Sequence, residues 1–185
     1  MIDDIIHEAE SKMSGAIDYA RQDFAAIRTG RATPDMFSKL QADYYGAPTS
    51  LLQLATFNSP EARTMLITPF DRNALPAIEK AIRNSDLGVA PSDDGITIRI
   101  VLPELTEERR REYVKVARNK AEDGRVAIRN IRRRSMEAVK KAQKDKTISE
   151  DEASRGEKLL DTATKKNIDL VDAMLKAKET ELMAV

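Results

Sequence analysis

Hydrophobic residues in the first part of the chain recur at steps of four and three, which is the spacing of one face of an α-helix. The repeat ends before Gly30, a residue that can adopt the left-handed conformation closing a helix, and Pro34 prevents the helix from resuming. We therefore predict one long helix with a single apolar face. The residues of that face are Ile2, Ile6, Ala9, Met13, Ile17, Ala20, Phe24 and Ile27.

Residues 31–105 show a different pattern, with short hydrophobic runs that are typical of β-strands. The clearest run covers 96–102, where isoleucines at every second position predict a strand with one buried face. The sequence Asp93-Asp94-Gly95 before it predicts a turn. Further strands are expected at 40–45, 51–57 and 64–68.

A short helix is expected inside this region, over about 74–85. Asn73 can cap it, and Pro76 falls in its first turn, where a missing N–H costs little. Because the helix lies between strands, the region is predicted to be a small β/α/β domain.

Helical spacing returns at Thr106, which we expect to cap a second long helix. The chain should turn near Lys146-Thr147, and Ser149 with Glu152 has the spacing of a capping box that starts a third helix. The expected apolar face of the second helix is Val114, Ala117, Ala121, Gly124, Ile128, Ile131, Ser135, Ala138 and Ala142, and that of the third is Ala153, Gly156, Leu160, Ala163, Leu170, Met174 and Leu182.

Three long helices with one apolar face each predict an α+β protein built on a long antiparallel three-helix bundle. The bundle would comprise residues 1–30 and 105–185, with the β/α/β domain, residues 31–104, inserted between its first two helices. Two short connections would join the domains and could act as a hinge. The hinge residues are Gly30, Arg31, Ala32 and Thr33 in the first connection and Pro103, Glu104 and Leu105 in the second.

Composition excludes several classes of protein. The chain has no cysteine, which rules out disulfides and thiolate metal sites. The acidic start, Met1-Ile2-Asp3-Asp4, is unlike a signal peptide, and no apolar run approaches the roughly 20 residues that span a membrane. We therefore expect a soluble cytoplasmic protein that binds no membrane.

The sequence also gives no support for an enzyme. His7 is the only histidine and is expected on the surface, and the seven glycines are too scattered for a phosphate-binding loop. Tyr44-Tyr45 could form a docking surface, although ordinary strand packing is the simpler interpretation. No catalytic residue, metal ligand or cofactor is expected.

The zero net charge conceals a strongly basic segment. Residues 106–146 contain 15 Lys and Arg against 7 Asp and Glu, an excess of eight positive charges. On a helical wheel, Arg118, Arg125, Arg129 and Arg132 lie to one side of the apolar face, and Arg133 lies beside them. We call these five residues together with Arg110 the arginine row.

Two interpretations of the arginine row remain open. It could be a solvated helix face carrying salt bridges between residues four apart. However, acids at that spacing within this helix are too few for most of the arginines, and arginine is suited to bidentate contact with phosphate. Structured RNA is therefore the favoured partner, because aromatic residues for stacking on single strands are absent from the row. A helical scaffold docking an acidic protein is the alternative, and an RNA-modifying enzyme is a distant third.

Several motifs give a more specific indication. They include Arg28-Thr29-Gly30-Arg31-Ala32-Thr33-Pro34, Tyr44-Tyr45-Gly46-Ala47-Pro48-Thr49, Leu102-Pro103-Glu104-Leu105-Thr106-Glu107-Glu108-Arg109-Arg110 and Ile128-Arg129-Asn130-Ile131-Arg132-Arg133. In this order and over the whole chain, the sequence resembles bacterial ribosome recycling factors. One departure is Arg134, where family members often have an acidic residue.

The resemblance implies an L-shaped, non-enzymatic protein that acts with elongation factor G to split the ribosome after termination. GTP is hydrolysed by that partner, so no cofactor of the chain itself is implied. The bundle would bind large-subunit ribosomal RNA, the smaller domain would face the elongation factor, and the protein is expected to be a monomer. Carried over by motif, Arg132, Arg129 and Arg110 are the expected RNA contacts, with Arg28 beside them; Arg125, Arg118 and Arg133 follow from position on the helix.

Overall fold

The computed structural model describes residues 1–184. The chain forms two compact units, one comprising residues 1–27 and the chain from 110 onward, the other comprising residues 28–109. We call the first the bundle and the second the β unit. The α+β fold class predicted from the sequence is confirmed.

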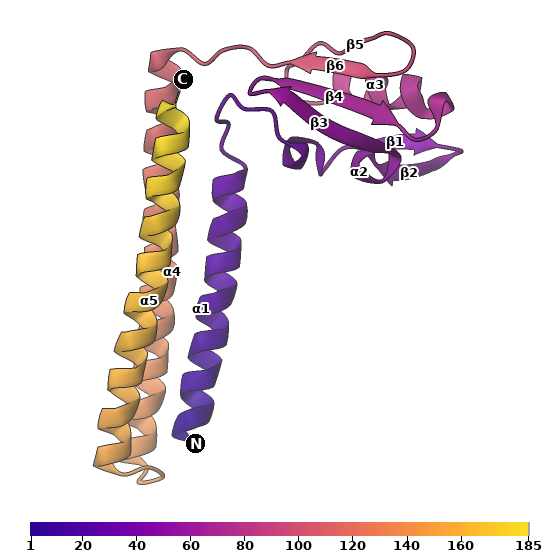
Figure 1. Cartoon of the computed structure of the whole chain (residues 1–185). Helices are drawn as coiled ribbons and strands as arrows, with labels where there is room; N and C mark the ends of the chain where they lie inside the picture. The colour runs from indigo at the N-terminus through magenta and orange to yellow at the C-terminus, as the bar shows by residue number, and fades with distance from the viewer. Residues whose placement is uncertain (185) are drawn as a thin grey trace. The chain divides into compact units, whose positions relative to one another are not determined.

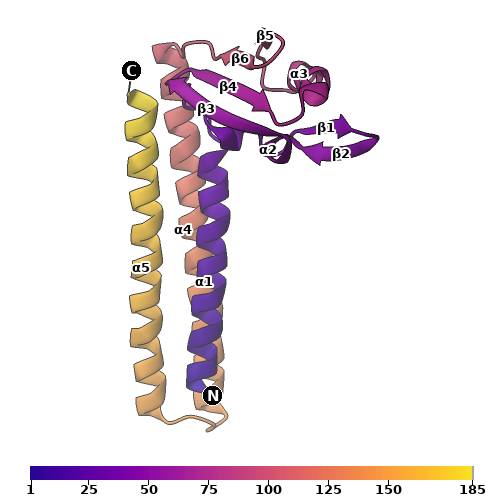
Figure 2. The ribbon, with the colours of Figure 1, turned by 45° about the vertical axis from the view of Figure 1, so that its right-hand side comes forward.

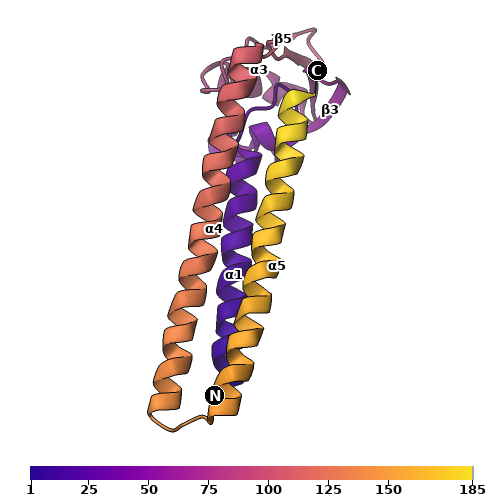
Figure 3. The same cartoon turned by 90° about the vertical axis from the view of Figure 1, so that its left-hand side faces the viewer.

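The bundle contains three long helices, α1 (Ile2–Ala25), α4 (Glu107–Lys144) and α5 (Glu150–Met183). They lie side by side in all three views of the ribbon (Figures 1, 2 and 3). Ile2 at the start of α1 packs with Val139 near the end of α4 and with Leu160 in α5. The first helix is therefore antiparallel to α4 and parallel to α5, as Figure 3 also shows.

Buried residues in the three helices recur every eleven residues. The series are Ile2, Met13 and Phe24 in α1, Ala117, Ile128 and Val139 in α4, and Leu160, Val171 and Leu182 in α5. Eleven residues make three turns at about 3.67 residues per turn, close to the 3.6 of a straight helix, so the sequence does not impose the left-handed supercoil of a seven-residue repeat.

This repeat corrects two of the predicted apolar positions. Leu170 is 39% exposed and Val171 is buried in its place, and Ala138 is exposed whereas Val139 is buried. From Ile128, the predicted steps of three, four and three residues add up to ten and end at Ala138. From Leu160, steps of three and seven residues end at Leu170, so each series stops one position short of the eleven-residue repeat. The capping box predicted for the third helix is correct: Ser149 and Glu152 form it reciprocally at the start of α5.

The β unit contains a four-stranded antiparallel sheet of β3 (Ala55–Glu61), β4 (Thr64–Pro69), β6 (Ile98–Val101) and β5 (Ser92–Asp93), in that order. Its core joins the sheet to α3 (Leu75–Arg83), through Ile67 and Ile98, which are paired between strands, and Ile78 and Ile82 of the helix. A separate hairpin is formed by β1 (Gln41–Tyr44) and β2 (Ala47–Ser50), followed by the short helix α2 (Leu51–Leu54). Single 3-10 turns cover Pro34–Phe37 and Arg72–Ala74.

Local predictions were less accurate in the β unit. The run at 51–57 begins as the helix α2 and becomes a strand only at Ala55. Asn73 does not cap α3: its backbone N–H instead donates to the Asp71 carboxylate, and α3 begins two residues later. The run expected to start at 96 begins pairing only at Ile98, because Ile96 and Thr97 donate their backbone N–H groups to the Asp94 carboxylate in the preceding turn.

Strand packing was expected of both Tyr44 and Tyr45, and it is found for Tyr44, the last residue of β1, which packs against the core of the β unit. Tyr44 is partly buried, but Tyr45 occupies the hairpin turn with a φ of 51° and is 79% exposed. Both hydroxyl groups donate to the Asp71 carboxylate, at 2.9 Å and 3.3 Å. The hydrogen bond from the backbone N–H of Asn73, followed by those from the two tyrosines, holds the pKa of Asp71 below its ordinary value.

Candidate nucleic-acid interface

The arginine row lies on a single uninterrupted helix, since α4 runs for 38 residues. Thr106 caps it as predicted, with its hydroxyl accepting from the Arg109 backbone N–H at 3.1 Å. Arg118, Arg125 and Arg132 follow one another at intervals of seven residues, about 10.5 Å along the helix axis. A continuous helix therefore spaces these three guanidinium groups evenly.

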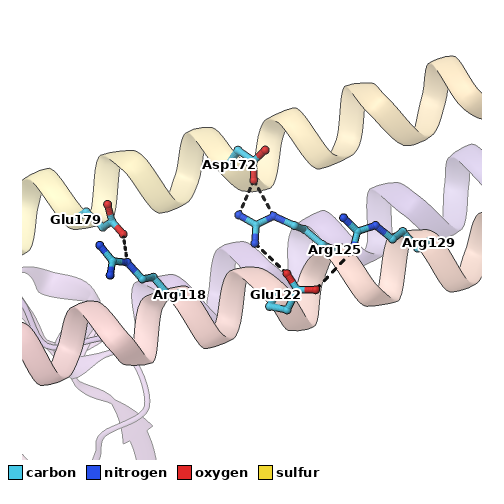
Figure 4. A network of polar contacts seen from close by, with 6 residues as sticks. All are labelled: Arg118, Glu122, Arg125, Arg129, Asp172 and Glu179. Carbon is cyan, nitrogen blue, oxygen red and sulfur yellow. Dashed lines mark hydrogen bonds and ion pairs between the residues drawn. The ribbon is translucent and has the colours of Figure 1, made fainter.

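Each of these three arginines pairs with a carboxylate on α5. Nε of Arg118 lies 2.8 Å from Oε1 of Glu179, and Nη2 of Arg125 lies 2.6 Å from Oδ1 of Asp172. Figure 4 shows these two pairs bridging the helices. The third pair joins Nη2 of Arg132 to Oδ1 of Asp161 at 2.7 Å.

Arg125 is the most enclosed of the three, with 21% of its side chain exposed. Asp172 binds its Nε and Nη2, while Glu122 of the same helix binds Nη1 at 3.1 Å, so carboxylates occupy both edges of the guanidinium (Figure 4). The hydrogen bond with Asp172 is the largest cause of the raised pKa of Arg125, which burial partly opposes. This side chain has little capacity left for another anion.

Arg129 and Arg133 have looser pairs within α4. Nη1 of Arg129 lies 3.5 Å from Glu122, and Nη1 of Arg133 lies 3.1 Å from Glu137. Both side chains are more than half exposed. Ion pairs of this kind typically contribute no more than about 1 kcal/mol, so a phosphate can displace or join them.

Arg110 and Arg28 belong to different parts of the structure. Arg110 is half-buried near the start of α4, and within residues 1–184 its side chain makes no ion pair. Arg28 lies in the β unit, where its Nη2 donates to the backbone oxygen of Asp86 at 2.8 Å.

The structure therefore adds partners that the sequence argument missed. Acids were sought four residues away on the same helix, whereas the carboxylates that pair with Arg118, Arg125 and Arg132 come from α5. A signal was present: Asp161 and Asp172 are eleven residues apart and Asp172 and Glu179 seven, which places all three on one face. The interpretation as salt bridges between residues four apart is correct only for Arg133 with Glu137, and most of the other pairs run between helices. Most of these arginines remain accessible.

The two segments expected to form a hinge differ in how tightly their residues are packed. Gly30 has a φ of 78°, and a Cβ at this position would lie 3.3 Å from Cγ of Leu105. Ala32 is buried and its N–H donates to the Ala62 oxygen at 2.7 Å. Arg31, Thr33, Pro103 and Glu104 are exposed.

Three further features concern the single histidine, possible metal ligands and possible membrane-spanning helices. His7 is exposed on α1, as predicted. Within residues 1–184 there is no group of three or more His, Cys, Asp or Glu residues arranged to hold a metal ion. Over the same range, every helix is too short or too polar to cross a membrane.

Comparison with known proteins gives one consistent result. A family model described as ribosome recycling factor matches residues 20–183. The chain is 60% identical to the ribosome-recycling factor of Cutibacterium acnes, over 98% of this chain and 99% of the relative. It is also 60% identical to that of Kineococcus radiotolerans, over the full length of both.

Solved structures of the same kind are similar along the whole chain. A solution structure of a ribosome recycling factor superposes with a TM-score of 0.83 at 40% identity, covering 100% of this chain and 98% of the other. A second match is the T. thermophilus ribosome recycling factor, described with E. coli elongation factor G bound to the E. coli post-termination complex. Its TM-score is 0.70 at 42% identity, with both chains covered completely.

Proposed function

The chain belongs to the ribosome recycling factor family, and we propose that it acts with elongation factor G to dissociate the ribosome after termination. The observation that carries this proposal is 60% identity over the full length of a curated relative, so both the bundle and the β unit are included. The proposed partners are elongation factor G and the post-termination ribosome, with which the structural relative is described. GTP is used by that factor, and this chain catalyses no reaction. Its place of action is the cytoplasm, as a monomer.

Large-subunit ribosomal RNA is the partner assigned to the arginine row in this proposal. Arg132, Arg129 and Arg110 are the principal contacts, with Arg28 from the β unit, and Arg118 and Arg133 flank them. The exposure of four of these side chains supports the assignment to RNA. Arg118, Arg129 and Arg133 are each more than half exposed, and Arg132 is 35% exposed. Arg125 is better suited to holding α4 against α5, because both edges of its guanidinium are already bound.

The connections near residues 30–33 and 103–105 serve as the hinge in this mechanism. The bundle would remain fixed on RNA while elongation factor G moves the β/α/β domain, residues 31–104, and the force would reach the subunit interface. A rigid bundle suits this role because its three helices pack continuously along their length. The left-handed backbone of Gly30 supports placing a pivot at the first connection.

The arginine row can be tested with Arg132→Ala. Each charge-assisted hydrogen bond to phosphate contributes about 1.5–3 kcal/mol, so binding to purified large ribosomal subunits should weaken roughly 10- to 100-fold. A matched control is Arg155→Ala, which also removes an exposed arginine that pairs with an aspartate on another helix, Asp3, but lies on α5. Equilibrium pelleting and subunit splitting with elongation factor G and GTP measure both effects.

Normal binding and splitting by Arg132→Ala would refute the assignment of RNA to this surface. Binding that is insensitive to salt would also contradict it, since phosphate contacts release counterions. Binding that survives ribonuclease treatment of the subunits would favour an acidic protein as the partner of the bundle.

A further inference from the structure

The ion pairs of the arginine row differ in which edge of the guanidinium they use. An arginine has five N–H donors: one edge presents Nε with Nη2, and the end presents Nη1 with Nη2. Each of these two edges can bind one carboxylate or phosphate with two hydrogen bonds. An arginine bound at only one edge can therefore still take a second anion.

Arg132 is bound at one edge only. Its Nε and its Nη2 both lie 2.7 Å from Oδ1 of Asp161. Within residues 1–184 its guanidinium makes no other hydrogen bond or ion pair, so Nη1 and the second hydrogen of Nη2 remain available. By contrast, Arg125 uses Nε and Nη2 for Asp172 and Nη1 for Glu122, as Figure 4 shows.

The contact with Asp161 also restricts the conformation of Arg132. A free arginine side chain samples many rotamers, and a ligand that binds it must order it. Two short bonds to a residue of the neighbouring helix fix the plane of this guanidinium before any ligand arrives. Its open end then keeps one position relative to α4, which is the condition for a preorganised anion site.

We propose that Asp161 is a positioning residue, which holds Arg132 by its Nε edge so that the Nη1–Nη2 end is presented to a backbone phosphate of RNA. This inference rests on the proposed function and deepens it, since it assigns a role to an acid that simple electrostatics would count as unfavourable. The carboxylate does not compete with the phosphate, because the two anions occupy different edges of one guanidinium.

Removing Asp161 should change the affinity for RNA in the direction opposite to the one expected from net charge alone. Asp161→Ala makes the protein more positive, and a purely electrostatic surface would then bind RNA more tightly. If Asp161 positions Arg132, its loss should instead weaken binding to large ribosomal subunits by about two- to tenfold, the effect of freeing one rotamer-rich side chain. Subunit affinity measured at one fixed salt concentration distinguishes the two cases.

Asp169→Ala is the matched control for charge. Asp169 is exposed on the same helix, and no hydrogen bond or ion pair of its side chain is found within residues 1–184. Its removal changes the net charge equally and should leave subunit affinity unchanged or slightly raised. Asp161→Asn should restore most of the affinity, because its amide oxygen can still accept from Nε and Nη2.

A double-mutant cycle shows whether Asp161 acts through Arg132. In an Arg132→Ala background, adding Asp161→Ala should cause no further loss of affinity. The inference is overturned if Asp161→Ala binds as tightly as Asp169→Ala, or if it weakens binding equally with and without Arg132. Should Arg132→Ala weaken binding while Asp161→Ala does not, the proposed function stands and only this inference fails. Should Arg132→Ala bind normally, both fail.

Discussion

The bundle and the β unit bury their cores in different ways. In the bundle, buried residues are spread along three long helices and fall into two successive clusters, one around Met13 and Ile128 and the other around Ile6 and Leu160. In the β unit, short segments from the sheet, the hairpin, α2, α3 and both 3-10 turns meet in one cluster. Loss of one core side chain should therefore be absorbed locally in the bundle and should affect the whole of the β unit.

Truncating one core residue in each unit should give the largest difference. Ile100 in β6 and Ile128 in α4 are both fully buried. Replacing either with alanine should cost about 2–5 kcal/mol. Because small domains are only marginally stable, Ile100→Ala should unfold the β unit while the bundle stays folded, and Ile128→Ala should loosen only the middle of the bundle.

Hydrogen exchange resolved by residue measures this difference. Loss of protection confined to residues 28–109 is expected for Ile100→Ala, with the helices protected as in the parent protein. Simultaneous loss of protection in both units, in either variant, would show that they unfold as one cooperative body and would remove the contrast.

The same contrast explains which elements could be predicted from the sequence. The long helices of the bundle were predicted correctly because a periodic pattern repeats many times along each of them, and the caps at Thr106 and Ser149 are local motifs. Val139 and Val171 were missed because the exact repeat length becomes visible only over three turns or more. In the β unit, β2 was not predicted; it contains Pro48, which a strand in a two-stranded hairpin tolerates because both strands are at an edge.

The candidate site was only partly predictable for a related reason. The positions of Arg118, Arg125 and Arg132 on one side of α4 follow from helical geometry alone. Their partners on α5 depend on the register between two antiparallel helices, which no local pattern specifies. The availability of Arg132 and the enclosure of Arg125 therefore became visible only in the structure.

Two glycine substitutions test the same difference between the bundle and the β unit, with a smaller expected effect on stability. Gly15 lies within helix α1, whereas Gly95 of the β unit has a φ of 88°, and a Cβ at either position would meet no atom within 4 Å. Gly15→Ala should stabilise the protein by about 0.5–1 kcal/mol through helix propensity. Gly95→Ala should destabilise it by about 1–2 kcal/mol, because an L-residue resists the left-handed region.

Thermal unfolding of the two variants provides the measurement. Since neither new methyl group touches a neighbour, a difference in sign can come only from the backbone conformation. Equal effects of the two substitutions would mean that the turn at Gly95 relaxes when alanine is introduced. That result would contradict the expectation that Gly15→Ala stabilises the protein and Gly95→Ala destabilises it.

The smallest expected effect concerns two glutamates whose pKa values shift in opposite directions. In the β unit, a hydrogen bond with Asp93 is the main cause of the raised pKa of Glu79, with burial next and Arg83 opposing both. In the bundle, the hydrogen bond and charge of Lys12 lower the pKa of Glu8. Glu79 therefore stabilises the fold when protonated, and this contribution is lost as the pH rises through the raised pKa of Glu79. Glu8 stabilises the fold when ionised, and this contribution is lost as the pH falls through the lowered pKa of Glu8.

Replacing each glutamate with glutamine should consequently change stability with opposite signs at neutral pH. Glu79→Gln should raise the Tm by roughly 1–3 °C at pH 7.5, because a neutral amide can donate to Asp93 without like-charge repulsion. The advantage should disappear near pH 4, where the parent glutamate is itself protonated. Glu8→Gln should lower the Tm slightly at pH 7.5 and have no effect in strong acid, as expected for an exposed pair. A loss of stability in Glu79→Gln at pH 7.5 would show that the ion pair with Arg83, 3.2 Å away, outweighs the repulsion from Asp93.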